Sequence, residues 1–209
     1  MSDSKPLLTL RAARIQLSEE SISIDLSVHA GERLAILAPE SAGKSRLMRV
    51  MAGLTPPESG EVIRQHATDC GLLFRVPELR FLCATPHEEV ALTPAARGLK
   101  GEALSERVEE SLQLAGVDAR HWGRGWHLLS AAQRYRVGMA VVYALRPRLL
   151  LLDEPGNALS DDGENDLAKR LNGFCRAYGS ATVVFTSRAA RAGLFAERIE
   201  RLPMQTPDI

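Results

Sequence analysis

The chain has 209 residues, of which 45% are hydrophobic and 25% are charged, a balance typical of a folded globular protein rather than a disordered one. Its 26 basic and 26 acidic side chains give a formal net charge of zero, which argues against a globally cationic surface for nucleic acid or an anionic membrane. The three cysteines, Cys70, Cys83 and Cys175, lack metal-ligand spacing and are typical of reduced cytosolic thiols.

Apolar patterning predicts the first elements of the chain. Alternating apolar residues predict two half-buried strands, one beginning at Leu8 and one over Ile22–Val28. The continuous apolar run Leu34–Ala38 predicts a strand that is buried on both faces. Over residues 47–54 the apolar side chains recur at helical spacing, and Gly53 is the expected stop of this helix.

The rest of the chain alternates between predicted strands and helices. Four further strands are predicted at Glu61–Arg64, Cys70–Phe74, Leu149–Leu152 and Ala181–Phe185. The stretch from Pro86 to about Leu129 is helix-prone and predicts an inserted helical lobe. A further helix is expected over Ser130–Leu145, because Pro147 prevents it from continuing. Strands that alternate with helices predict an α/β fold with a parallel sheet and helices on its faces.

A phosphate-binding loop is predicted between the buried strand and the first helix. Its residues are Ala38, Pro39, Glu40, Ser41, Ala42, Gly43, Lys44 and Ser45, with Arg46 following in the first helical turn. In such a loop the backbone N–H groups curl around phosphates, and the positive end of the helix dipole points at them. Lys44 is expected to bridge the β- and γ-phosphates, and Ser45 is expected to hold Mg²⁺.

The alternative for this loop is a strand–turn–helix junction that contains Gly-Lys-Ser by chance. Ala38 and Ser41 also stand where many such loops have glycine, and their side chains would crowd the ligand and reduce its affinity. The strand before the loop and the helix after it nevertheless favour nucleotide binding.

Two adjacent acids end the apolar strand Leu149–Leu152. Asp153 is expected to bind in the Mg²⁺ shell, and Glu154 is placed to polarise an attacking water as a general base. The alternative is that both carboxylates cap the strand at the surface. An apolar strand that runs into adjacent acids about a hundred residues after a phosphate loop is better explained as the second half of a nucleotide site.

The phosphate loop and two later motifs resemble those of a known family. The phosphate loop, Leu129–Gln133 and Leu145–Pro155 resemble the ATP-binding subunit of an ATP-binding cassette (ABC) transporter, and the resemblance extends from about Leu7 to Leu202. The segment Thr85–Pro94 is similar to one found in cobalt-type and energy-coupling-factor import ATPases.

The resemblance implies one ABC domain over residues 1–209. Its fold would be a P-loop NTPase (RecA-like) core with a parallel sheet, a small antiparallel β subdomain and an inserted helical lobe. The implied nucleotide-binding core covers residues 7–85 and 147–203, and the lobe, with the signature helix, covers 86–146.

The resemblance also implies a mode of action. Two such domains, from the same or a homologous chain, would sandwich ATP and Mg²⁺ between the loop of one and the signature motif of the other, and would drive an integral membrane transporter subunit. We therefore expect a cytoplasmic subunit that is peripheral at the inner face of the cell membrane through its partner, because no stretch of the sequence is long and apolar enough to span a bilayer.

Slow hydrolysis of Mg-ATP is expected. The alternative is a non-hydrolysing, degenerate subunit that acts as the regulatory half of a heterodimer. A cassette acting on nucleic acid is not expected, because the basic surface it needs is missing.

Several positions depart from the family pattern. Alanines replace both glycines of the signature motif between Ser130 and Gln133, whose spacing also predicts a capping box at a helix start. The resemblance adds contact of Ser130 and Gln133 with a partner's γ-phosphate. Arg75 replaces a glutamine and would repel Mg²⁺, bind phosphate or lie as a solvated charge. Ser187 replaces the switch histidine and has no switchable charge.

Other residues have mainly structural interpretations. No aromatic residue near Gln16 or Leu17 is available to stack on adenine. The segment 120–127, with its two tryptophans and two histidines, is more typical of lobe packing or a partner contact than of base stacking. Four arginines near the end are expected on a solvated face: Arg188, Arg191, Arg198 and Arg201. Three apolar residues are candidates for exposed contacts with a membrane partner, or for ordinary core: Leu79, Phe81 and Leu82.

Overall fold

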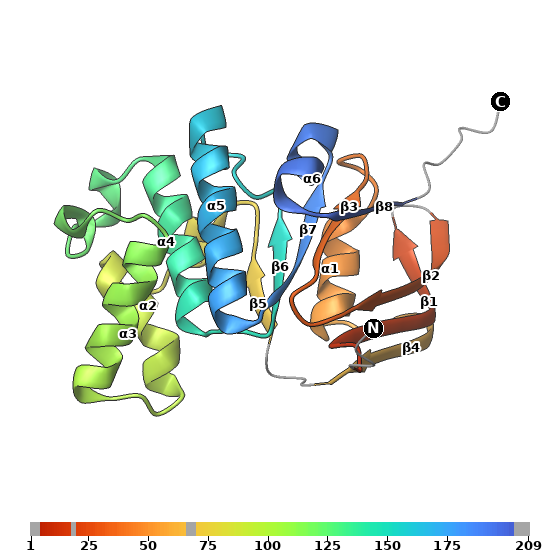
Figure 1. Ribbon diagram of the computed structural model, residues 1–209, viewed down its shortest axis with the longest axis horizontal. Helices are drawn as coiled ribbons and strands as arrows, with labels where there is room; N and C mark the ends of the chain where they lie inside the picture. Colours follow the sequence, from red (N-terminus) through yellow and green to blue (C-terminus); the bar gives the residue numbers. More distant parts are fainter. Residues whose placement is uncertain (1–4, 18–19, 66–69, 203–209) are drawn as a thin grey trace. The chain divides into compact units, whose positions relative to one another are not determined.

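The structure is a computed structural model that describes residues 5–17, 20–65 and 70–202 (Figure 1). The chain forms two compact units. The first unit is made of Met1–Leu72, Arg148–Pro155 and Gly179–Ile209, and the second of Leu73–Pro147 and Gly156–Tyr178. The sequence suggested a lobe over residues 86–146 alone, whereas residues 73–85 and 156–178 also group with the second unit by their contacts.

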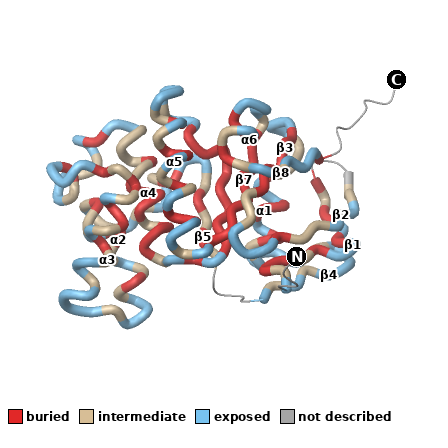
Figure 2. Tube along the Cα trace, in the orientation of Figure 1, coloured by how far each residue is buried: buried red, intermediate tan, exposed pale blue. Residues whose placement is uncertain are grey.

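A five-stranded sheet forms the centre of the first unit. Its strand order is β5-β6-β7-β3-β8, with β3 (Arg33–Leu37), β5 (Cys70–Leu73), β6 (Leu149–Asp153), β7 (Ala181–Thr186) and β8 (Arg198–Arg201). β3 is parallel to β7 and β8, and β6 is parallel to β7. These pairings confirm the predicted α/β fold with a parallel sheet, and Figure 2 shows the burial of its central strands.

Two helices of the first unit pack on this sheet. α1 (Lys44–Ala52) contacts β6 and β7, and α6 (Ala189–Phe195) contacts β3 and β7. α1 ends at Gly53, as predicted, with this residue in the left-handed conformation. α6 and β8 were not predicted, because neither has a long apolar period in the sequence.

A separate antiparallel sheet completes the first unit. Its order is β2-β1-β4, with β1 (Leu8–Leu17), β2 (Glu20–Val28) and β4 (Ser59–Arg64). The register of β1 shifts around Ala12, which has φ 44° and donates its N–H to Asp25 Oδ1 at 2.8 Å. The bulge interrupts the alternation of buried and exposed residues. The alternating pattern in the sequence therefore showed only the first part of β1, which continues to Leu17.

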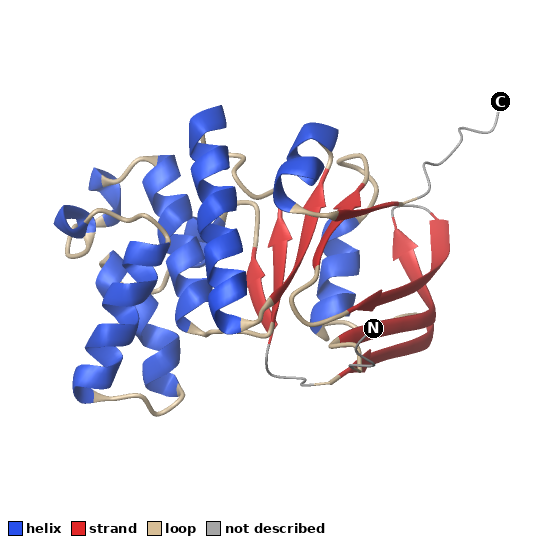
Figure 3. Cartoon of the chain, viewed as in Figure 1, coloured by secondary structure: helices blue, strands red, loops and turns tan. Residues whose placement is uncertain are grey.

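The second unit is helical (Figure 3). Its α-helices are α2 (Pro86–Ala96), α3 (Gly101–Leu114), α4 (Ala131–Ala144) and α5 (Asp161–Tyr178), and its 3₁₀ turns are η1 (Pro77–Arg80), η2 (Ala119–His121) and η3 (Trp126–Leu128). α2, α3 and α4 pack on one another, and Tyr143 of α4 stacks on Phe174 of α5 with ring centroids 4.3 Å apart. α4 ends before Pro147, as predicted, whereas α5 was not predicted.

Both tryptophans take part in packing within the second unit. Trp126 stacks on Phe81 with ring centroids 4.3 Å apart and donates its indole N–H to the Cys83 carbonyl at 2.7 Å. Trp122 donates to the Val117 carbonyl at 3.0 Å. These contacts support lobe packing over base stacking.

In residues 5–17, 20–65 and 70–202, no helix combines the length and the hydropathy that crossing a bilayer requires.

Candidate nucleotide-binding site

The predicted phosphate loop connects the end of β3 to the start of α1. Ala38 continues from the strand by donating its N–H to the Thr186 carbonyl at 3.0 Å, and the helix begins at Lys44. Gly43 precedes the helix with φ 71°, and a Cβ at this position would lie 2.9 Å from Leu17 Cα. Both the backbone angle and the space therefore require glycine here.

Lys44 closes the loop from the inside. Its ammonium donates to the carbonyls of Ala38 at 3.0 Å and of Pro39 at 2.8 Å, and the residue is only 4% exposed. The loop is further folded by a hydrogen bond from Ala42 N–H to the Pro39 carbonyl at 3.2 Å. The first N–H groups of a helix have no partner within the helix. The positive end of the helix dipole lies at the same place as the charge of Lys44, so the two attract an anion together. This arrangement suits an anion such as a phosphate.

The structure brings Ser45 and Asp153 together, although they are 108 positions apart in the sequence. Ser45 Oγ donates to Asp153 Oδ2 at 3.0 Å. Asp153 ends β6 and is buried, whereas Ser45 is exposed. A hydroxyl and a carboxylate are hard oxygen ligands of the kind Mg²⁺ takes beside a nucleotide. The pair therefore fits the predicted metal site.

Glu154 is buried and only 3% exposed, so the alternative of a surface cap is wrong for this residue. Its Oε1 accepts the Ser187 N–H at 2.8 Å and lies 3.4 Å from the Lys44 ammonium. Its Oε2 accepts the Thr186 hydroxyl at 2.9 Å and Arg191 Nη1 at 3.1 Å. The backbone of Glu154 has φ 47°, an angle that non-glycine residues adopt at a cost of about 1–3 kcal/mol.

The surroundings keep Glu154 ionised. Burial alone would raise its pKa, but hydrogen bonds from Thr186 and Ser187 and the charge of Lys44 lower the pKa below its usual value. A carboxylate held in this way stays negatively charged at neutral pH and is a weak base.

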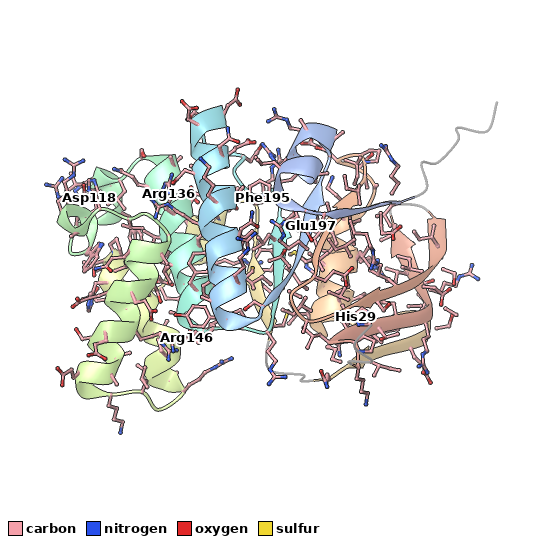
Figure 4. All side chains as sticks on the ribbon, in the orientation of Figure 1. His29, Asp118, Arg136, Arg146, Phe195 and Glu197 are labelled. Carbon is pink, nitrogen blue, oxygen red and sulfur yellow. The ribbon has the colours of Figure 1, made fainter. Side chains whose placement is uncertain are left out.

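Arg191 is a neighbour of Glu154 that sequence reasoning missed. The expectation of a solvated face is wrong for this residue, because it is 2% exposed and paired with Glu154. It shares the buried face of α6 with Ala192 and Phe195, the last of which is labelled in Figure 4. The one available signal was its spacing of four residues from Phe195. Arg198 is partly exposed and pairs with Glu32, and Arg188 and Arg201 are exposed, as expected.

Two residues of β1 lie beside the loop. Arg46 Nη1 donates to Gln16 Oε1 at 3.3 Å, which sets a polar pair at the start of α1. Leu17 is buried against Gly43 and supports the loop. Of the two residues considered near adenine, Leu17 therefore has a structural role.

Ser187 donates its backbone N–H to Glu154 Oε1 at 2.8 Å, and its side chain also hydrogen-bonds to this carboxylate and lowers its pKa. Together with Ala38 and Pro39 it lines a hollow of about 660 Å³ that adjoins the first residues of the loop. Nucleotide contact by Ser187 stays a prediction.

The remaining predicted site residues belong to the second unit. Ser130 and Gln133 form the predicted capping box, since Ser130 Oγ accepts Gln133 N–H at 3.2 Å and Gln133 Oε1 accepts Ser130 N–H at 2.7 Å. The Gln133 amide also lies 2.9 Å from His121 Nε2. Arg75 is exposed in the bend after β5. Nucleotide contact by Arg75, Ser130 and Gln133 stays a prediction.

Comparison with known proteins decides the family. Residues 22–157 match the family described as ABC transporter. The chain belongs to this family. This ABC cassette is 32% identical over 200 residues to the energy-coupling factor transporter ATP-binding protein EcfA1 of Symbiobacterium thermophilum, a match covering 90% of this chain and 68% of that protein. It is 36% identical over 190 residues to the cobalt import ATP-binding protein CbiO of Rhodobacter capsulatus, covering 84% of this chain and 67% of that protein.

A solved ABC cassette has the same fold. The dimeric ATP-binding cassette MJ0796, bound to ADP and Pi, matches with a TM-score of 0.80 and 25% identity, covering 93% of this chain and 94% of that one. Across five curated relatives, this ABC cassette spans 59–68% of the relative's own length. The similarities confirm the predicted family, the predicted fold class and the resemblance to energy-coupling-factor and cobalt-type ATPases.

Proposed function

We propose that this chain is the ATP-binding subunit of an ABC-type importer of the energy-coupling-factor or cobalt kind, and that it binds and slowly hydrolyses Mg-ATP. The observation that carries this proposal is the 3.0 Å contact between Ser45 and Asp153 beside the loop that Lys44 closes. A lysine, a hydroxyl and a carboxylate in this arrangement match the needs of a magnesium-bound triphosphate. The family membership of the chain supports the same conclusion.

In this proposal each residue has a defined part. Lys44 and the N–H groups of the loop that have no carbonyl partner bind the phosphates, and Ser45 and Asp153 hold Mg²⁺. The ion, when bound, neutralises charge on the phosphate oxygens. Glu154 orients the attacking water and accepts its proton. Because Glu154 stays bound by Arg191, Thr186 and Ser187 when Lys44 binds the phosphates, we expect it to be a weak base and hydrolysis to be slow.

Two partners belong to the proposal. A second cassette, identical or homologous, would complete the nucleotide site with its signature motif, and the dimeric state of the matched solved cassette supports such pairing. An integral membrane subunit would dock on the second unit. Leu79 and Leu82 support this docking, because they are 82% and 80% exposed, whereas Phe81 is committed to packing on Trp126.

Calorimetric titration with ATP, in the presence and absence of Mg²⁺, tests the nucleotide site. Ser45→Ala removes the exposed hydroxyl, so we expect it to weaken Mg-ATP binding by about tenfold and to leave Mg²⁺-free ATP binding unchanged. Ser105→Ala on the exposed face of α3 is the matched control and is expected to change neither. If the wild-type chain gives no heat with Mg-ATP, even with a partner cassette added, the proposed function is wrong.

A further inference from the structure

The carboxylate of Glu154 is shared by two buried cations. Arg191, on α6, contacts Oε2 at 3.1 Å, and Lys44, on α1, lies 3.4 Å from Oε1. All three side chains are at most 5% exposed. A guanidinium does not lose its charge in a protein, and a buried charge needs a counter-ion. The group is therefore an ionic triplet inside the first unit.

Arg191 and Lys44 differ in how firmly they are held at Glu154. Thr186, Ser187 and Arg191 come from one continuous segment, β7 and the start of α6, so their hydrogen bonds to Glu154 are set by the local fold. Lys44 also donates to two loop carbonyls, and its contact with Glu154 is the longest of the four. Lys44 is thus the partner that can leave Glu154 when a phosphate enters the loop.

The departure of Lys44 would leave Glu154 with one cation, at the moment when the negative charge of the phosphates arrives. A buried carboxylate that loses its only counter-ion is strongly destabilising. Arg191 remains in place, so the carboxylate stays compensated. Its Oε1 becomes open on one side, while Oε2 stays bound to Arg191 and Thr186.

We propose that Arg191 is a positioning residue for nucleotide binding, which neutralises Glu154 and thereby releases Lys44 to the phosphates. The inference rests on the proposed function, because it requires that Lys44 binds a triphosphate. It adds that nucleotide affinity depends on a residue of α6 that does not itself contact the nucleotide. Without Arg191, Lys44 is the main counter-ion of Glu154 and is held back from the phosphates.

The experiment is a double-mutant cycle of nucleotide affinity in the full chain. The probe is a Mg²⁺ complex of a non-hydrolysable ATP analogue, and its dissociation constant is measured by calorimetry. We expect Arg191→Met to weaken binding by about tenfold or more in the wild-type background. In the Glu154→Gln background no carboxylate charge has to be compensated, so the same change is expected to alter affinity by less than about twofold. Arg176→Met, at an exposed position of α5, is the control for loss of an arginine in general.

Each outcome has a distinct meaning. Equal loss of affinity in both backgrounds, or no loss in either, overturns the role of Arg191. Failure of the wild-type chain to bind the analogue overturns the proposed function, and this inference with it. Arg191→Lys keeps the charge and is expected to bind within about threefold of the wild type, whereas a loss as large as that of Arg191→Met would contradict the charge argument. If Arg191→Met does not fold, this lysine variant and the double variant, which removes both charges, carry the same test.

Discussion

Gly43 lies directly against Leu17, at a distance that leaves no room for a side chain. An added Cβ would approach Leu17 Cα to 2.9 Å, and the φ of 71° already disfavours any other residue. The contact joins the start of α1 to the end of β1. The shape of the phosphate loop therefore depends on a strand of the antiparallel sheet as well as on the parallel sheet.

Gly43→Ala is expected to destabilise the chain by about 2 kcal/mol or more, because it combines left-handed strain with a clash against backbone. The same change should weaken Mg-ATP binding, since the loop N–H groups move. Gly173→Ala is the matched control: it lies in α5 with open space around the added Cβ, and should stabilise by about 0.5–1 kcal/mol. Thermal unfolding of both variants checks this. Equal stability of the two would contradict the proposed clash.

Glu154→Gln is expected to lower phosphate release by about a hundredfold or more, while Mg-ATP binding is retained or becomes tighter. The amide removes the negative charge between Lys44 and Arg191, so Lys44 is free to bind phosphate. It also leaves two buried cations without their anion, and we expect a loss of about 3 kcal/mol of unfolding free energy.

Phosphate release and chemical denaturation of purified protein measure the two effects of Glu154→Gln separately. Ser105→Ala again provides the control on the exposed face of α3. If wild type and Glu154→Gln release phosphate equally slowly while both bind nucleotide, the chain is a non-hydrolysing subunit.

Much of the fold could be predicted because three strands of the parallel sheet are continuous apolar runs. β3, β6 and β7 are buried along their length, and few other arrangements hide so many apolar side chains in a row. α5 has no such run, because it is amphipathic: its buried Leu167, Leu171 and Phe174 recur at helical spacing and alternate with polar residues. Its start is marked by Ser160, whose hydroxyl accepts the Gly163 N–H at 3.3 Å, a signal that sequence reasoning did not use.

The site was predictable only where its chemistry depends on a linear motif. Gly43, Lys44 and Ser45 are consecutive, and their spacing encodes the loop directly. Arg191 is different, because an arginine in a short helix is usually exposed. Its burial follows from the position of Glu154 across the first unit, and such a long-range pairing leaves no local pattern.

Because of Asp166, the free energy of unfolding of the second unit should fall as the pH is lowered into the acid range. Burial alone would raise the pKa of its carboxyl, but hydrogen bonds and charges from Arg170 and Arg136, each 2.8 Å away, lower this pKa below its usual value of 3.8. A carboxyl with a lowered pKa in the folded state adds stability at pH values above its unfolded pKa. This contribution is lost as the pH falls through the folded pKa.

Asp166→Asn should therefore cost stability at neutral pH, by less than about 1 kcal/mol because the ion pairs are partly exposed. The difference from the wild type should shrink as the pH is lowered from about 5 to about 3. Urea unfolding at a series of pH values measures it, and Glu106→Gln, exposed on α3, serves as the control. A difference that stays constant or grows toward acid would contradict the assignment.

Leu79 and Leu82 offer the sharpest test of the proposed membrane partner. They are more than three-quarters exposed, beside an aromatic pair that fixes the surrounding segment. Replacing both with serine removes apolar surface without opening the core, so the unfolding temperature and Mg-ATP affinity should stay at wild-type values. Co-purification of a multi-span membrane subunit expressed with the chain should fall by about tenfold or more, because apolar anchors dominate such contacts.

The control is Leu128→Ser, at another exposed position of the second unit, which should leave co-purification unchanged. Retention of the membrane subunit by the double serine variant would place the docking surface elsewhere.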